Sequence, residues 1–167
     1  MAAALLSLTA CGSGDSANTS TIASITNEAS VTASTVNGEV PYTFFDDTVF
    51  VGDSVSLKLN LYVSAQRKMD STFMGTAQFL TPGSYGTGNE LKELGSENSV
   101  HPSYNGTEMY LADAIEAMGA KKVFIMLGMN DIAVYGNDGA VKNMETVLKQ
   151  IKEKNPDTAI YVQSMTP

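Results

Sequence analysis

Short apolar runs alternate with longer helical patterns from about Pro41 onward. Four of these runs have the length and the β-branched or aromatic content of strands, and they cover residues 48–51, 76–81, 122–127 and 159–163. The run from Lys122 to Leu127 is too continuous for a half-exposed strand. Such a run is typical of the centre of a parallel sheet.

Three segments between the runs have the spacing of helices. The first contains Val55, Leu59 and Tyr62, and the second covers residues 107–118, with Thr107 as its N-cap and Gly119 as its stop. The third starts after the cap-like Asn137-Asp138, closes at Asn155-Pro156 and has an apolar stripe of Val141, Met144, Leu148 and Ile151. Strands and helices that alternate in this way predict an α/β sheet with right-handed crossovers and helices on both faces.

The N-terminal part of the chain has a different composition. Residues 12–40 are dominated by Ser, Thr, Ala, Gly and Asn, with too few large apolar side chains to offset the entropy of ordering. We therefore expect a disordered tether over 12–40 and a folded domain over 41–167.

Composition narrows the classes of function. A formal net charge of -8 and a pI near 4.5 argue against nucleic-acid binding, which needs a basic face. With one cysteine and one histidine, the chain can form neither an internal disulfide nor a Cys/His zinc site. We therefore expect no metal site. The glycines at 83, 86 and 88 do not form a nucleotide-binding Gly-x-Gly-x-x-Gly, so we also expect no cofactor.

The cysteine itself suggests an anchor. Residues 1–11 end in Leu8-Thr9-Ala10-Cys11, which resembles the lipobox that closes a bacterial lipoprotein signal peptide. The resemblance implies lipidation of Cys11 and an extracytoplasmic protein attached to the membrane by lipid alone. A disordered N-terminus with a chance cysteine is the alternative.

Candidate chemistry follows the strands, because functional loops of α/β sheets lie at the carboxyl ends of their strands. The first three loops contain Gly52-Asp53-Ser54, Pro82-Gly83-Ser84 and Gly128-Met129-Asn130-Asp131. A second Gly-Asp-Ser at residues 14–16 has no strand before it and no helix after it, so it cannot present a hydroxyl on a rigid edge.

These loops resemble the SGNH hydrolase superfamily of GDSL-like esterases and lipases. Phe50-Val51-Gly52-Asp53-Ser54 is similar to the first block of the family, Leu127-Gly128-Met129-Asn130-Asp131 to the third, and Gly83 is taken as the glycine of the second. The resemblance implies a flavodoxin-like three-layer α/β/α sandwich with a mainly parallel sheet.

The family mechanism gives each position a role. Ser54 would attack an ester carbonyl, and the oxyanion would be held by the N–H groups of Ser54 and Gly83 and by the Asn130 amide. Gly52 would permit the turn before Ser54, and Asp53 and Asp131 would orient their loops, with Gly128 in support. In the alternative interpretations Ser54 is only an N-cap, Asn130 only satisfies its own loop, and Gly83 is a turn glycine.

The general base is missing from this pattern. The family supplies it from a late Asp-x-x-His block that this chain lacks, and His101, before Pro102, is expected to be a surface or substrate-side residue rather than the base. We therefore expect a fragment of a longer esterase with poor activity, an uncovered sheet edge and a tendency to aggregate. The expected substrates are acetyl esters of carbohydrates or lipid esters; the alternative function is an inactive, surface-displayed binding domain.

Overall fold

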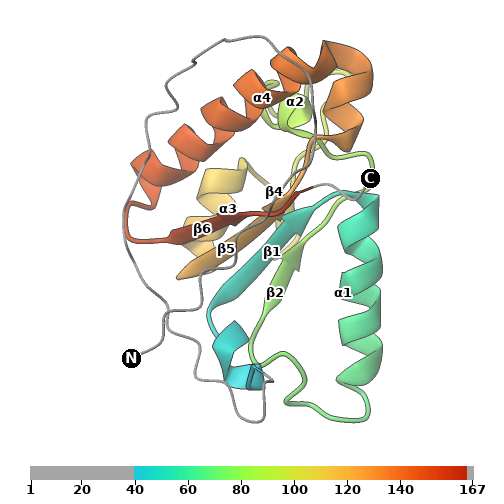
Figure 1. Ribbon diagram of the computed structural model, residues 1–167, viewed down its shortest axis with the longest axis vertical. Coiled ribbons are helices and arrows are strands. Elements are labelled where there is room, and N and C mark those ends of the chain that lie inside the picture. The colour runs from blue at the N-terminus through green and yellow to red at the C-terminus, as the bar shows by residue number, and fades with distance from the viewer. Residues whose placement is uncertain (1–39, 165–167) are drawn as a thin grey trace, which may run out of the picture. The chain divides into compact units, whose positions relative to one another are not determined.

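A computed structural model describes residues 40–164 of the chain (Figure 1). Its main sheet has four parallel strands in the order β2-β1-β5-β6. These strands are β1 (Thr48–Gly52), β2 (Gln78–Leu80), β5 (Lys122–Met126) and β6 (Ala159–Val162). All four predicted strands are confirmed, and β5 is central, as its continuous apolar run predicted.

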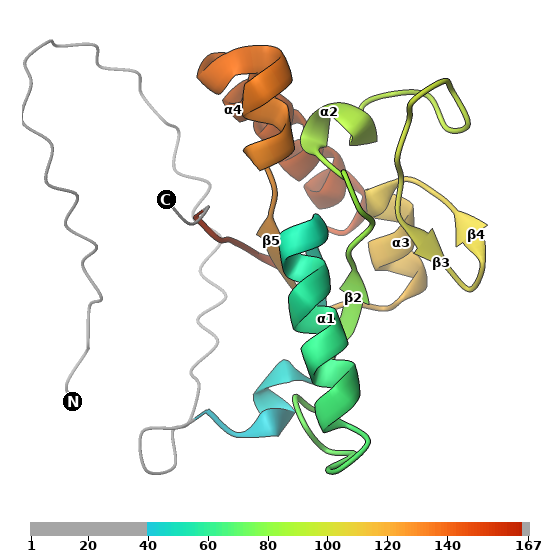
Figure 2. The same ribbon diagram turned by 90° about the vertical axis from the view of Figure 1, so that its right-hand side faces the viewer.

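Helices cover both faces of this sheet (Figures 1 and 2). Helix α1 (Ser54–Gln66) lies on one face, and α3 (Leu111–Ala117) and α4 (Met129–Lys154) lie on the other. The arrangement follows from right-handed crossovers, because the chain steps from β1 to β2 in one direction and from β5 to β6 in the opposite one. The predicted α/β architecture with a parallel sheet is therefore confirmed.

The main core lies between the sheet and the pair α3 and α4. Alternate residues of β1 and β5 point to this side, as the two-residue period of a strand requires. Their side chains pack against α3 and α4 in one cluster that includes Val49, Val51, Val123, Ile125, Leu111, Ile115, Val147 and Ile151.

Aromatic rings occupy the other face of the sheet. One ring from each strand stands in register with the next, so that the centroids are 5.3 Å apart between Phe79 and Phe50, 5.2 Å between Phe50 and Phe124, and 4.7 Å between Phe124 and Tyr161. Stacking across neighbouring strands holds the register of the sheet on this side.

The segment predicted as a helix over 107–118 divides differently. Thr107 does not cap a helix; it belongs to a hairpin of β3 (Ser103–Tyr104) and β4 (Thr107–Glu108). The hairpin turns at Asn105 and Gly106, which have φ values of 51° and 79°. Asn-Gly favours this type of turn, and it overrides the helical pattern. Helix α3 begins at Leu111, and Gly119 follows it with a φ of 64°, as its role as a stop predicted.

The third predicted helix starts earlier than its stripe suggested. Helix α4 begins at Met129 and is broken at Gly136, where φ is 66° and ψ is 179°. The cap-like Asn137-Asp138 therefore follows a break inside α4 rather than starting the helix. Val141 is 59% exposed, while Val147 and Ile151 are buried, and the helix ends at Asn155 as predicted.

The predicted face of α1 is also corrected. Leu59 and Tyr62 are 37% and 54% exposed, and the buried side chains of this helix are Ser56 and Val63. The helix is nearly as apolar on its outer side as on its inner side, so spacing alone does not reveal which face is buried.

The N-terminal predictions fall outside the described part of the chain. Cys11, the signal-peptide remnant, the tether up to residue 39 and the copy of Gly-Asp-Ser at residues 14–16 all lie there. Within residues 40–164, no helix has the length and apolar character that a membrane crossing requires.

Candidate functional site

Ser54 is the first residue of α1, and its side chain is exposed at the carboxyl edge of the sheet. The helix is capped by Asp53, whose Oδ1 accepts a hydrogen bond of 2.8 Å from the N–H of Val55. The interpretation of Ser54 as an N-cap is therefore wrong. Its hydroxyl makes no hydrogen bond to any residue between 40 and 164.

Gly52 is required by close packing. A Cβ at this position would lie 2.0 Å from Oγ of Ser56 and 3.0 Å from the carbonyl oxygen of Met126. The first turn of α1 can thus approach the end of β1 only if residue 52 has no side chain. This close approach sets the point at which Ser54 leaves the sheet.

Asn130 joins three segments of the chain. It lies in the first turn of α4 after Gly128, whose φ of 125° favours glycine. Its Nδ2 donates to the carbonyl oxygen of Tyr85 over 2.8 Å and to Oδ2 of Asp53 over 3.4 Å. The amide therefore satisfies groups outside its own loop, and it links the loop after β2 to the residue beside Ser54.

Asp131 holds the same loop from behind. Its carboxylate is buried and accepts hydrogen bonds of 2.9 Å from the N–H of Thr87 and 2.6 Å from that of Gly88. These N–H groups belong to α2 (Thr87–Glu90). A Cβ on Gly86 would lie 2.9 Å from Oδ2 of Asp131, so glycine is needed for this close approach.

Gly83 lies differently from Gly86. It is exposed, and a Cβ built on it meets nothing within 4 Å. The contact between this loop and Asn130 is made by the carbonyl of Tyr85, which shares a peptide unit with Gly86. Sequence reasoning placed the functional glycine at 83, and it did not single out Tyr85 or Gly86.

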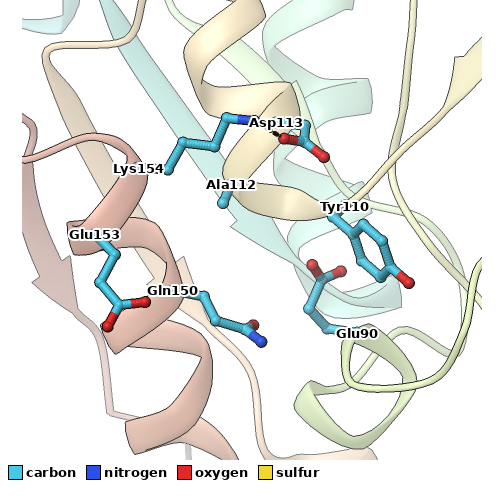
Figure 3. A pocket seen from close by; sticks show the side chains of 7 residues that line it. All are labelled: Glu90, Tyr110, Ala112, Asp113, Gln150, Glu153 and Lys154. Carbon is cyan, nitrogen blue, oxygen red and sulfur yellow. Dashed lines mark hydrogen bonds and ion pairs between the residues drawn. The ribbon is translucent and has the colours of Figure 1, made fainter.

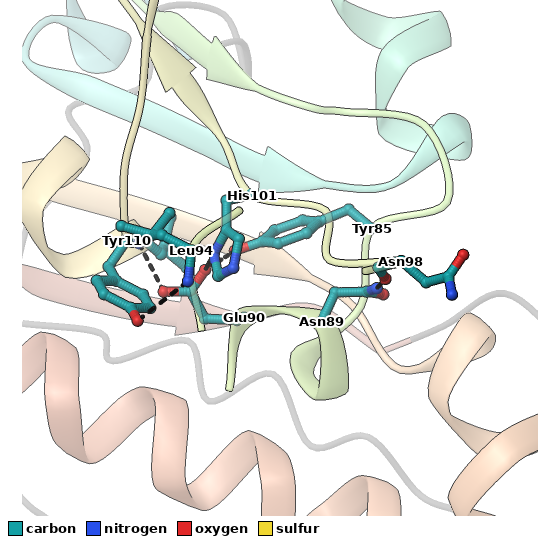
Figure 4. Close-up of polar contacts among 8 residues, drawn as sticks. Tyr85, Asn89, Glu90, Leu94, Asn98, His101 and Tyr110 are labelled. Carbon is teal, nitrogen blue, oxygen red and sulfur yellow. Dashed lines mark hydrogen bonds and ion pairs between the residues drawn. The ribbon is translucent and has the colours of Figure 1, made fainter. Parts of the chain in front are cut away.

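His101 is a buried residue, which corrects its expected surface position. It is 4% exposed, and its Nδ1 lies 3.3 Å from Oε2 of Glu90, while its ring meets that of Tyr110 edge to face (Figure 4). The histidine thus has a carboxylate partner that no sequence pattern indicated. Its Nε2 is buried and has no partner among residues 40–164.

Glu90 is the centre of this buried cluster. Its Oε2 accepts a hydrogen bond of 2.8 Å from the phenol of Tyr85, and its Oε1 accepts one of 2.6 Å from the N–H of Leu111. Burial raises the pKa of Glu90, although these hydrogen bonds and His101 act against the shift. Burial and the neighbouring Glu90 also raise the pKa of Tyr85 well above its ordinary value.

A cleft of about 420 Å³ lies between α3 and the last turns of α4 (Figure 3). Glu90 and Tyr110 line it together with Asp113, Gln150, Glu153 and Lys154, but Ser54 and Asn130 do not. The described residues, 40–164, contain no group of three or more His, Cys, Asp or Glu side chains that could hold a metal ion.

No family model, curated protein or solved structure matches this chain.

Proposed function

We propose that this chain is a serine esterase of the SGNH type that cleaves small carboxylic esters with Ser54 as the nucleophile. One observation carries the proposal: Asn130 contacts both Asp53, the neighbour of Ser54, and Tyr85 in the loop after β2. These contacts bring the ends of β1 and β5 and the loop after β2 together at one edge of the sheet. Serine esterases need a nucleophile and oxyanion donors on neighbouring loops, and this arrangement supports the proposal.

The proposed chemistry begins with attack of the Ser54 hydroxyl on the ester carbonyl. Negative charge then develops on the carbonyl oxygen at the N-terminus of α1, where free N–H groups and the helix dipole favour an anion. The Asn130 amide is a second donor once its long contact with Asp53 gives way. The third is the N–H of Gly83, the glycine chosen from sequence, in the loop whose Tyr85 carbonyl accepts the hydrogen bond from Asn130.

The proposed mechanism also needs a general base that accepts the proton of Ser54. The 167 residues contain one histidine, and the buried His101 is engaged by Glu90. Without a base at Ser54, attack relies on the oxyanion donors and on binding alone. We therefore expect the ester substrate to acylate Ser54 slowly. Added imidazole should speed this step, because it can accept the proton of the serine hydroxyl.

The test is the release of p-nitrophenol from p-nitrophenyl acetate, with and without imidazole. Ser54→Ala removes the nucleophile, and Ser64→Ala is the matched control because Ser64 is an exposed serine on the same helix. We expect release above the imidazole background in the unmodified chain and in Ser64→Ala, and none in Ser54→Ala.

Equal release by all three proteins, each shown to be folded, would contradict the esterase proposal. It would favour the alternative of an inactive binding domain with the same fold. The acyl group is open within the proposal, and acetyl esters of carbohydrates and lipid esters are the substrates to compare next.

For location, we propose a lipid anchor on Cys11 and an extracytoplasmic site of action, on the resemblance of residues 1–11 to a lipobox. The test is the membrane fraction of a bacterial host that expresses the chain. Cys11→Ser should release the protein from membranes, and retention of this variant there would contradict the anchor.

A further inference from the structure

Glu90 connects three segments of the chain from a buried position. It is 3% exposed, and its two oxygens receive the phenol of Tyr85 and the N–H of Leu111, with Nδ1 of His101 at 3.3 Å (Figure 4). A buried carboxylate is costly unless its oxygens accept hydrogen bonds, so these partners fix where the side chain can lie.

Tyr85 connects Glu90 to the candidate site. Its side chain is fully buried, with the phenol on Glu90, and its own carbonyl oxygen accepts the hydrogen bond from Asn130. A tyrosine side chain has only two torsions between ring and backbone. Holding the hydroxyl therefore restricts the peptide unit between Tyr85 and Gly86 as well.

Asp131 holds a different part of the loop after β2. It binds the N–H groups of Thr87 and Gly88, beyond Gly86, and makes no hydrogen bond to the peptide unit of Tyr85 within residues 40–164. The loop after β2 is thus held at two points, by Asp131 at the start of α2 and by Glu90 through Tyr85. Only the second point includes the carbonyl that Asn130 contacts.

We propose that Glu90 is a positioning residue for the candidate site, which it reaches through Tyr85 to hold the Tyr85–Gly86 peptide against Asn130. An effect of Glu90 on catalysis rests on the proposed esterase function, whereas its effect on the position of the Tyr85–Gly86 peptide does not. The relay is Glu90 carboxylate, Tyr85 phenol, Tyr85 carbonyl and Asn130 amide, with 2.8 Å at each of its two hydrogen bonds.

The electrostatic surroundings of Glu90 make this relay sensitive to its charge. An ionised carboxylate accepts from Tyr85 and Leu111 at once, whereas a protonated one has fewer lone pairs to offer. The titratable groups that face Glu90 are Tyr85 and His101 in direct contact and Tyr110, Asp113, Glu153 and Lys154 along the cleft, while Asp131 lies near Tyr85.

The experiment follows amide resonances in the ¹⁵N-labelled full chain by NMR. Tyr85→Phe removes only the hydroxyl. Tyr110→Phe is the matched control because the hydroxyl of Tyr110 accepts a hydrogen bond from the N–H of Leu94 and makes none with Glu90 among the described residues. We expect Tyr85→Phe to shift the backbone amide of Gly86 and the side-chain amide of Asn130, and Tyr110→Phe to leave both in place. A folded Tyr85→Phe protein with both resonances unmoved would overturn the proposal.

A pH titration of the same resonances covers the case in which Tyr85→Phe does not fold. In the unmodified chain the Gly86 and Asn130 signals should follow the titration of the Glu90 carboxyl carbon, and in Glu90→Gln that step should vanish. A step that persists in Glu90→Gln would overturn the role of Glu90.

Neither the resonance shifts nor the pH titration depends on ester cleavage. They therefore test the positioning role of Glu90 separately from the esterase proposal. If Ser54 also reacts, Tyr85→Phe should slow acylation by less than the roughly 100-fold expected for outright removal of an oxyanion donor. Resonance shifts without any reaction at Ser54 would retain the positional claim and count against the esterase.

Discussion

The side-chain amide of Asn130 lies 2.8 Å from the carbonyl oxygen of Tyr85, so the first turn of α4 is tied to the loop that follows β2. The same amide reaches Asp53 at the start of α1. Three loops that are distant in sequence therefore meet through one side chain.

The close approach of Gly86 to Asp131 predicts unequal effects of two glycine substitutions. Gly86→Ala would push a methyl group to 2.9 Å from the Asp131 carboxylate, and we expect a loss of about 1–3 kcal/mol in the free energy of unfolding. Gly83→Ala enters open space and should leave stability unchanged or slightly raised. Urea unfolding compares the two, and an equal loss at both positions would contradict the packing at Gly86.

Asp131 is predicted to stabilise the chain through its two N–H partners. In Asp131→Asn an amide replaces one of the acceptor oxygens, so the N–H of Thr87 or Gly88 loses its acceptor, at a cost of about 1–3 kcal/mol. Asp138→Asn on the exposed side of the same helix is the control and should change little. Thermal melting of both variants measures the difference, and a stable Asp131→Asn protein would argue against these bonds.

Burial of Glu90 predicts a pH dependence of stability. Its pKa is raised in the folded chain above the ordinary value of 4.5, so the folded state binds the proton more tightly than the unfolded state does. That contribution favours folding at low pH and is lost as the pH rises from about 4.5 through the folded pKa.

Glu90→Gln stays neutral at every pH, so its stability relative to the unmodified chain should improve as the pH is raised across this window. Melting temperatures at several pH values between 4 and 8 measure the trend. Glu93→Gln, an exposed change in the neighbouring segment, should show no such trend. A constant difference between Glu90→Gln and the unmodified chain would mean that burial does not shift this carboxyl.

Sequence patterns predicted the four strands and placed Ser54 and Asn130 after the carboxyl ends of two of them, β1 and β5. The reason is physical: buried parallel strands need continuous apolar runs, and their carboxyl ends share one edge. Patterns of this kind are local, so they also located Gly119 and Asn155 as helix ends.

Other features depend on packing between distant segments. The pairing of Glu90 with His101 joins a short helix to a loop, and no periodicity in the chain marks it. The required glycine at 86 is set by the carboxylate of Asp131, 45 residues later in the sequence. The Asn105-Gly106 turn is a local signal, and in the structure it overrides the helical pattern at the start of 107–118.

The most direct test of the central claim is to map the acetyl group after incubation with p-nitrophenyl acetate, by peptide mass spectrometry. We compare the unmodified chain with Asn130→Ala and with Asn143→Ala, a control on the same helix. The account predicts acetylation of Ser54 in the unmodified chain and in Asn143→Ala, and at least a tenfold lower yield in Asn130→Ala because an oxyanion donor is lost. Acetyl groups spread over surface side chains, with Ser54 unmodified or indifferent to Asn130, would contradict it.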